Sequence, residues 1–100
     1  MADAIQPRSQ VNNATSIVTA AGTLFNANTS RVQWTIQNVG TDTLYVKLGA
    51  GASSSDYHVA LAAGSAADDG LGGFLSSDVV SYNGIVTIAG TTVRAAVVEL

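Results

Sequence analysis

The sequence contains no cysteine and few charged residues. Without cysteine the chain can form no disulfide and no thiolate metal site. Charged residues make up 11% of the chain, against about a quarter in an average globular protein. Serine, threonine, asparagine and glutamine must therefore form much of the polar surface. Their desolvation costs less free energy than that of lysine or glutamate when another protein covers them. This composition favours a protein that is packed among other subunits.

Basic residues are scarce and scattered, at Arg8, Arg31, Lys47 and Arg94. Nucleic-acid binding requires clustered cations that neutralise phosphates, so no nucleic-acid partner is expected. No apolar run approaches the length of a transmembrane helix, and Asp3 precedes any cation, unlike the start of a secretory signal peptide. We therefore expect no membrane partner and synthesis in a cytoplasm.

Motifs for catalysis or cofactor binding are also missing. His58 is the only histidine, and no nucleophile or orienting carboxylate accompanies it in a recognisable pattern. Asp68 and Asp69, with Asp56 and Asp78, offer oxygen ligands for calcium, but their spacing fits no EF-hand and adjacent aspartates are typical of turns. The glycine-rich residues 70–73 lack the lysine and the helix of a phosphate loop. We expect no enzyme activity, no metal and no cofactor.

The clearest pattern present is an alternation of apolar and polar residues between Arg31 and Gly49. Val32, Trp34 and Ile36 share one face of the first segment, and the alternation resumes from Leu44 to Leu48. Side chains on a strand repeat every two residues, so each segment has one face for a core. The sequence predicts a β-hairpin here, with Trp34 in the core.

Further short strands are expected along the rest of the chain. Residues 15–21 and 23–25 are joined at Gly22 and form a tight hairpin or one bent strand. Residues 57–63 form a strand with Tyr57, Val59 and Leu61 on one face and His58 on the other. Residues 79–82 and 85–89 are joined by a turn at Asn83-Gly84, and residues 93–100 form the last strand. The long loop of residues 64–78 either hides a short element or is functional, and its Leu71, Phe74 and Leu75 are expected to pin it to the body. No segment has a helical apolar stripe. The pattern predicts an all-β protein, an antiparallel β-sandwich or a jelly-roll-like barrel of about seven or eight short strands.

The strands form one domain, residues 14–100, preceded by an extended N-terminal arm at residues 1–13. The arm is either a frayed terminus or a segment that orders on a neighbouring subunit. Tyr45 lies beside Lys47 on the expected outer face, which makes it a candidate partner contact. The full set of candidate contacts is Gln6, Arg8, Gln10, Asn12 and Asn13 in the arm, with Tyr45, Asp68 and Asp69 in the domain.

The residues from Arg31 to Leu100 resemble small accessory virion proteins of tailed bacteriophages, of the decoration or cement type. The resemblance is carried by the alternating stretch of residues 31–49, by Asp69-Gly-Leu-Gly-Gly73, by Tyr82-Asn-Gly-Ile-Val-Thr-Ile-Ala-Gly90 and by the closing Val98-Glu-Leu100. It implies a β-sandwich that attaches to the outside of a capsid or to another virion part, often as a symmetric oligomer.

Composition and resemblance together predict a structural virion protein that is made in the host cytoplasm. We expect it to decorate the phage head as a homo-oligomer, with a trimer favoured, and to bind the major capsid protein or another virion protein. The alternative is a tail- or fibre-associated module that recognises a cell-surface glycan through Tyr45 or Tyr57 and the glycine-rich loops.

Overall fold

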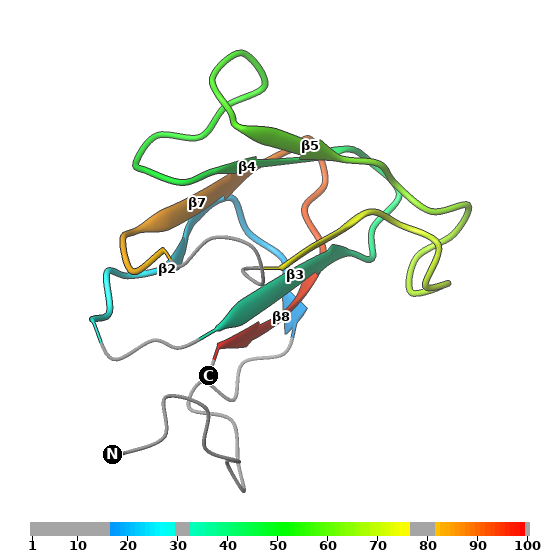
Figure 1. The fold of residues 1–100 in the computed structure, drawn as a ribbon. Coiled ribbons are helices and arrows are strands. Elements are labelled where there is room, and N and C mark those ends of the chain that lie inside the picture. The colour runs from blue at the N-terminus through cyan, green and yellow to red at the C-terminus, as the bar shows by residue number, and fades with distance from the viewer. Residues whose placement is uncertain (1–16, 30–32, 77–81, 100) are drawn as a thin grey trace, which may run out of the picture.

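Two antiparallel four-stranded sheets pack face to face (Figure 1). The structure is a computed structural model, and it describes residues 17–29, 33–76 and 82–99, which contain strands and no helix. The strands are β1 (Ile17–Val18), β2 (Gly22–Phe25), β3 (Trp34–Asn38), β4 (Leu44–Lys47), β5 (Val59–Leu61), β6 (Phe74–Ser76), β7 (Val86–Ala89) and β8 (Ala95–Glu99). One sheet has the order β1-β8-β3-β6 and the other β2-β7-β4-β5.

The strand order is that of a jelly roll. The first strand pairs with the last, β2 with β7, β3 with β6, and β4 with β5. This is the nesting of one long hairpin, and the further pairs β3·β8 and β4·β7 form where the hairpin wraps around the core. The prediction of an all-β protein is confirmed, and of the two predicted architectures the structure has the antiparallel β-sandwich.

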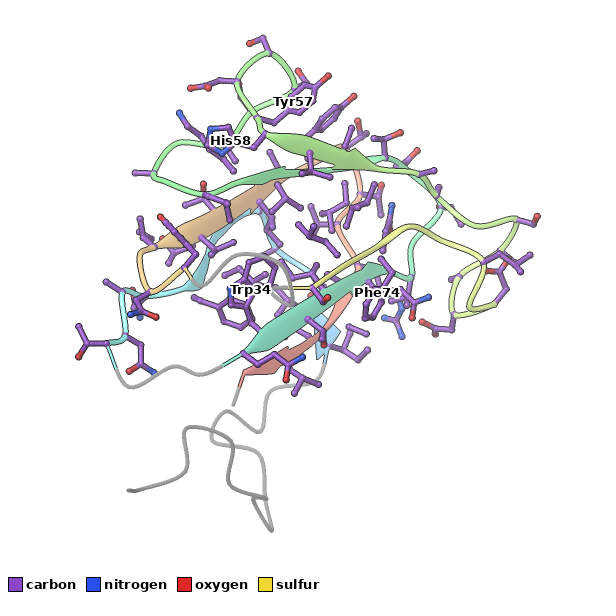
Figure 2. The ribbon with its side chains drawn as sticks, viewed as in Figure 1. Trp34, Tyr57, His58 and Phe74 are labelled. Carbon is purple, nitrogen blue, oxygen red and sulfur yellow. The ribbon has the colours of Figure 1, made fainter. Side chains whose placement is uncertain are left out.

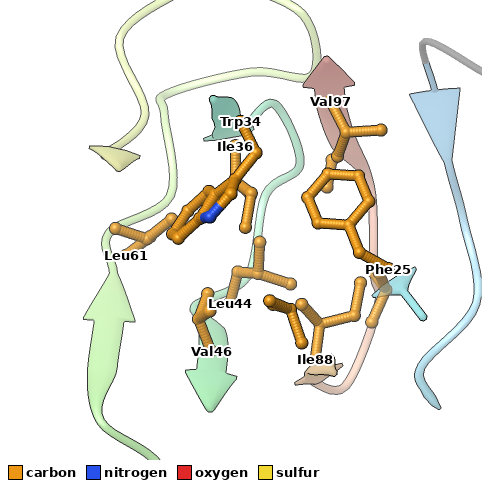
Figure 3. Packing of buried hydrophobic residues seen from close by; sticks show 11 residues of the cluster. Phe25, Trp34, Ile36, Leu44, Val46, Leu61, Ile88 and Val97 are labelled. Carbon is orange, nitrogen blue, oxygen red and sulfur yellow. The ribbon is translucent and has the colours of Figure 1, made fainter. Parts of the chain in front are cut away.

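The core lies between the sheets and is built by the predicted alternation. Trp34 and Ile36 on β3 and Leu44 and Val46 on β4 are all buried, and Figure 3 shows them pointing toward one another with Phe25 and other apolar side chains. Burying one such side chain contributes about 1.5–3 kcal/mol, so this cluster is the main source of stability. The placement of Trp34 in the core is confirmed. Val32 lies outside the described residues.

The predicted hairpin of residues 31–49 is wrong. β3 pairs with β8 and β6, whereas β4 pairs with β7 and β5 in the opposite sheet. Alternation indicates which side chains face a core, and two strands that face the same core from opposite sheets have the same pattern as two strands in one hairpin. The link between β3 and β4 therefore crosses from one sheet to the other.

The side chain of Asn38, at the end of β3, holds this crossing. Its Nδ2 donates hydrogen bonds to the carbonyl oxygens of Asp42 and Leu61, each at 2.9 Å, and its Oδ1 accepts the Gly40 N–H at 3.0 Å. Asn38 is 1% exposed, so these bonds satisfy a buried amide that would otherwise be costly. The Leu61 carbonyl belongs to β5, so one side chain connects both sheets.

Two other predicted connections also differ from the structure. β1 and β2 lie in opposite sheets, so the tight hairpin at Gly22 is wrong and the chain bends across at residues 19–21. β7 has β2 on one side and β4 on the other, which leaves no place for a hairpin through Asn83-Gly84. Residues 79–81 lie outside the described residues, and the Tyr82 hydroxyl donates to the Ile85 carbonyl oxygen at 2.7 Å. The final strand is confirmed as β8.

Replacing Asn38 with alanine should destabilise the protein by about 3 kcal/mol, because the buried partners of its amide lose their hydrogen bonds. Urea unfolding followed by tryptophan fluorescence would measure the change. Gln37→Ala, one residue earlier and on the outer face, is the matched control and should cost no more than about 1 kcal/mol. Equal effects of the two substitutions would contradict the role assigned to Asn38.

Candidate interaction surfaces

Among the described strand residues of the β1-β8-β3-β6 sheet, those that point outward carry no charge. Ile17, Ala96, Gln37 and Phe74 follow one another in a single cross-strand row. Ile17 is 41% exposed and Phe74 is 61% exposed, which is unusual for side chains of this size. We call this surface the adhesion face; it consists of Ile17, Thr35, Gln37, Phe74, Ser76, Ala96 and Val98.

A hydrogen-bonded loop, residues 62–73, borders the adhesion face. Oδ2 of Asp69 accepts the N–H groups of Ser65 and Ala66 at 2.7 and 2.9 Å, and its Oδ1 accepts the Leu71 N–H at 2.9 Å. Nε2 of Gln37, on the adhesion face, donates to the Gly70 carbonyl oxygen at 3.2 Å. The loop therefore presents Leu71, 70% exposed, at the rim of the adhesion face.

Asp68 fixes the same loop to the body of the protein. Both its carboxylate oxygens accept hydrogen bonds from Arg94 at 2.8 Å, and its own N–H donates to the Val39 carbonyl oxygen at 2.8 Å. Its φ of 62° lies in the left-handed region, which aspartate tolerates better than most residues. The bidentate pairing makes this contact geometrically specific.

These contacts shift the pKa values of Asp68, Asp69 and Arg94. The hydrogen bond from Arg94 lowers the pKa of Asp68, and the pKa of Arg94 is raised in turn. The backbone N–H of Leu71, followed by that of Ala66, lowers the pKa of Asp69. Both carboxylates therefore stay ionised at pH values below the usual aspartate range. The Asp69 carboxylate binds N–H groups of the loop itself, whereas the Asp68 carboxylate binds Arg94 outside the loop.

The apolar residues of this loop lie differently from the prediction. Leu75 packs against the core as expected, but Leu71 and Phe74 point to solvent, so the pinning of the loop by all three side chains is wrong. Polar contacts of Asp68 and Asp69 hold the loop instead. The alternative expectation, that the segment hides a short element, is confirmed by β6.

Sequence reasoning missed Ile17, Leu71 and Phe74 as surface residues. One signal for Phe74 was available: Phe74 and Leu75 are adjacent, and in a strand only one of two neighbours can face the core. Asp68 and Asp69, predicted as contacts, lie in the loop that carries exposed Leu71, but their carboxylates already accept hydrogen bonds from Arg94 and from loop N–H groups, respectively. The candidates Gln6, Arg8, Gln10, Asn12 and Asn13 and the arm of residues 1–13 lie outside the described residues and stay predictions.

Tyr45 belongs to the other sheet and lies on its outer face, as predicted. Its ring stacks on that of Tyr57 with the centroids 4.8 Å apart and the planes tilted by 47°. The prediction that Tyr57 shares a face with Val59 and Leu61 is therefore wrong. Tyr57 precedes β5, and the backbone leaves the strand alternation before it reaches this residue. Tyr57 and His58 lie above the β4–β5 layer, Trp34 lies between the sheets, and Phe74 lies beside β3 (Figure 2).

Polar groups border the two tyrosines. Nζ of Lys47 and Oδ2 of Asp56 form an ion pair at 2.6 Å. Nδ1 of the exposed His58 accepts the Leu48 N–H at 2.9 Å. The loop after β4 also covers β7, where the Thr87 hydroxyl donates to the Gly49 carbonyl oxygen at 2.7 Å. Within the described residues, no three or more His, Cys, Asp or Glu side chains gather as potential metal ligands.

No protein-family model, no curated protein and no solved structure matches this chain. No part of the described chain forms an apolar helix of membrane-spanning length.

Acid should loosen the loop of residues 62–73. Because the pKa of folded Asp69 is lowered, its hydrogen bonds stabilise the loop above the ordinary aspartate pKa and are lost as the pH falls through the lowered value. The amide ¹H and ¹⁵N shifts of Ser65, Ala66 and Leu71 should titrate together with a midpoint below the ordinary range. In Asp69→Asn the three amides should be shifted already at neutral pH and should not titrate. Amides that keep their neutral-pH shifts in that variant would contradict the model of the loop.

Proposed function

We propose that the protein is a structural virion protein of a tailed bacteriophage that decorates the outside of the head as a homo-oligomer, with a trimer favoured. It binds the major capsid protein or another virion protein, and it acts by adhesion and not by catalysis. The resemblance of residues 31–100 to decoration proteins supports this role. The jelly-roll strand order agrees with it, because this architecture recurs in viral capsid proteins, although one fold serves many functions.

The observation that carries the proposal is the uncharged adhesion face with its exposed apolar side chains. A partner that covers the seven residues of this face desolvates no charged side chain among them, and the charges of Asp68 and Arg94 in the neighbouring region are already paired with each other. The polar loop beside it holds Leu71 in place before binding, which reduces the conformational entropy lost on contact. Contiguous apolar side chains on a surface are typical of protein-binding sites.

The size of the face explains why an oligomer is needed. Completing the burial of Ile17, Leu71 and Phe74 would contribute about 1–2 kcal/mol for each side chain. Association costs roughly 4–15 kcal/mol in lost freedom of motion. One protomer would therefore bind a shell weakly, whereas several linked copies engage neighbouring sites at high effective concentration. Decoration by a homo-oligomer follows from this balance.

The double substitution Leu71→Ser and Phe74→Ser should reduce occupancy on purified heads by at least about tenfold, because the apolar contact area is lost in every copy. Occupancy would be counted by cryo-electron microscopy of particles assembled with the variant in place of the wild-type protein. Tyr57→Ser, which removes an exposed aromatic ring from the opposite sheet, is the matched control and should leave occupancy unchanged. Full occupancy of the double variant, with its fold verified by circular dichroism, would refute the assignment of this face.

Removing residues 1–13 should abolish binding to heads and leave the melting temperature of the β domain nearly unchanged, because the arm is expected to order on a neighbouring subunit. A second variant, with Gln6, Arg8, Gln10, Asn12 and Asn13 all changed to alanine, keeps the length of the arm and removes its polar contacts. Co-sedimentation with heads would measure both. Undiminished binding of the truncated protein would exclude the arm from the contact.

A further inference from the structure

The outer face of the β2-β7-β4-β5 sheet differs in chemistry from the adhesion face. It carries the stacked rings of Tyr45 and Tyr57, the ion pair of Lys47 and Asp56, and His58. We propose that this surface, which we call the tyrosine shelf, is a binding site for a neutral saccharide. The shelf consists of Tyr45, Lys47, Asp56, Tyr57, His58, Ala60 and Ala89.

In the aromatic part of the shelf Tyr57 is exposed and Tyr45 is half-buried. Tyr45 has Ala60 directly opposite on β5 and Ala89 directly opposite on β7, so only methyl groups flank its ring within the sheet. Tyr57 is 43% exposed and rises beside it at a tilt of 47°. The two rings and the two methyl groups make a shallow apolar step. The C–H face of a pyranose ring is flat and apolar, and it stacks on such rings.

The polar part of the shelf matches the hydroxyl groups of a sugar. Lys47 has three N–H donors and the carboxylate of Asp56 has several acceptor positions, so each keeps hydrogen-bonding capacity beyond their ion pair at 2.6 Å. Nδ1 of His58 accepts the Leu48 N–H, which places the proton of a neutral imidazole on Nε2. Donors and acceptors therefore lie together next to an apolar step, as recognition of a polyol requires.

Charge distinguishes a saccharide from the other ligands that stack on aromatic rings. A nucleotide would bring phosphate, but the one cation of the shelf is already neutralised by Asp56, and the chain has a formal net charge of -3. A neutral ligand does not meet this repulsion. The same neutrality disfavours anionic sugars, so the assignment is to uncharged saccharides.

This inference does not depend on the proposed virion role, because the two surfaces lie on opposite sheets. If both hold, a protein attached to a head by its adhesion face would present the tyrosine shelf outward. Saccharide binding by the isolated protein tests the shelf alone, and head occupancy tests the adhesion face alone.

The experiment is an NMR titration of the full chain with maltohexaose, cellohexaose and N-acetylglucosamine hexamer, with adenosine as a non-saccharide probe. At least one saccharide should shift the amides of residues 45–47, 56–60 and 89 at millimolar concentration. Tyr57→Ala should weaken that binding about tenfold, as expected for the loss of one stacking partner. Phe74→Ala removes an exposed aromatic ring from the other sheet and should leave the affinity unchanged.

A second variant covers the case in which Tyr57→Ala does not fold. Ala60→Gln keeps both rings and fills the space beside Tyr45, so it should block binding while the melting temperature stays near that of the wild type. Three results would overturn the proposal: no shelf shift with any of the saccharides, tighter binding of adenosine, or undiminished saccharide affinity in Ala60→Gln. If Ala60→Gln keeps its saccharide affinity and Tyr57→Ala has a lowered melting temperature, the role of the ring pair is to stabilise the loop between β4 and β5.

Discussion

The arrangement of the two sheets depends on the buried amide of Asn38. Its hydrogen bonds join the end of β3 to the crossing segment and to β5, so a single side chain determines where the chain leaves one sheet and how the other sheet is placed. The backbone reinforces the same point, since the Asn38 N–H donates to the Gly73 carbonyl oxygen at 2.9 Å and the Gly73 N–H donates to the Ala62 carbonyl oxygen at 2.8 Å. A Cβ at Gly72 would overlap the Asn38 carbonyl oxygen, so the approach of this loop requires glycine.

Both candidate surfaces follow from this junction. It fixes the start of β6 next to β3, which brings Phe74 opposite Gln37 at the outer edge of the β1-β8-β3-β6 sheet. It also anchors β5 beside β4, and Tyr57, two residues before β5, thereby reaches Tyr45. The apolar core between the sheets then keeps an uncharged face and a polar, aromatic face on opposite sides of one small domain.

The sequence correctly predicted the all-β architecture, but it did not predict which strands pair with each other. Alternation correctly assigned Trp34 and Leu44 to the core, because a strand with one buried face must repeat every two residues. The same rule cannot choose between a neighbour in the sheet and a strand across the core, and for that reason the hairpin prediction failed. Tyr45 was placed correctly on an outer face, whereas its contact with Tyr57 depends on a bend outside any strand. The exposure of Leu71 depends on carboxylate contacts of Asp69, which no local pattern encodes.

The four edge strands of the two sheets are short in the described part of the chain: β1 has two residues, β5 and β6 have three each, and β2 has four. An unpaired margin is a template on which another chain can add a strand, and long, flat margins promote fibre growth. The proposed role on a phage head would display the protein in many copies at high local density, where this hazard is greatest. The described edge strands offer few free backbone groups for such strand addition, so in the proposed role neighbouring copies would stay separate from one another.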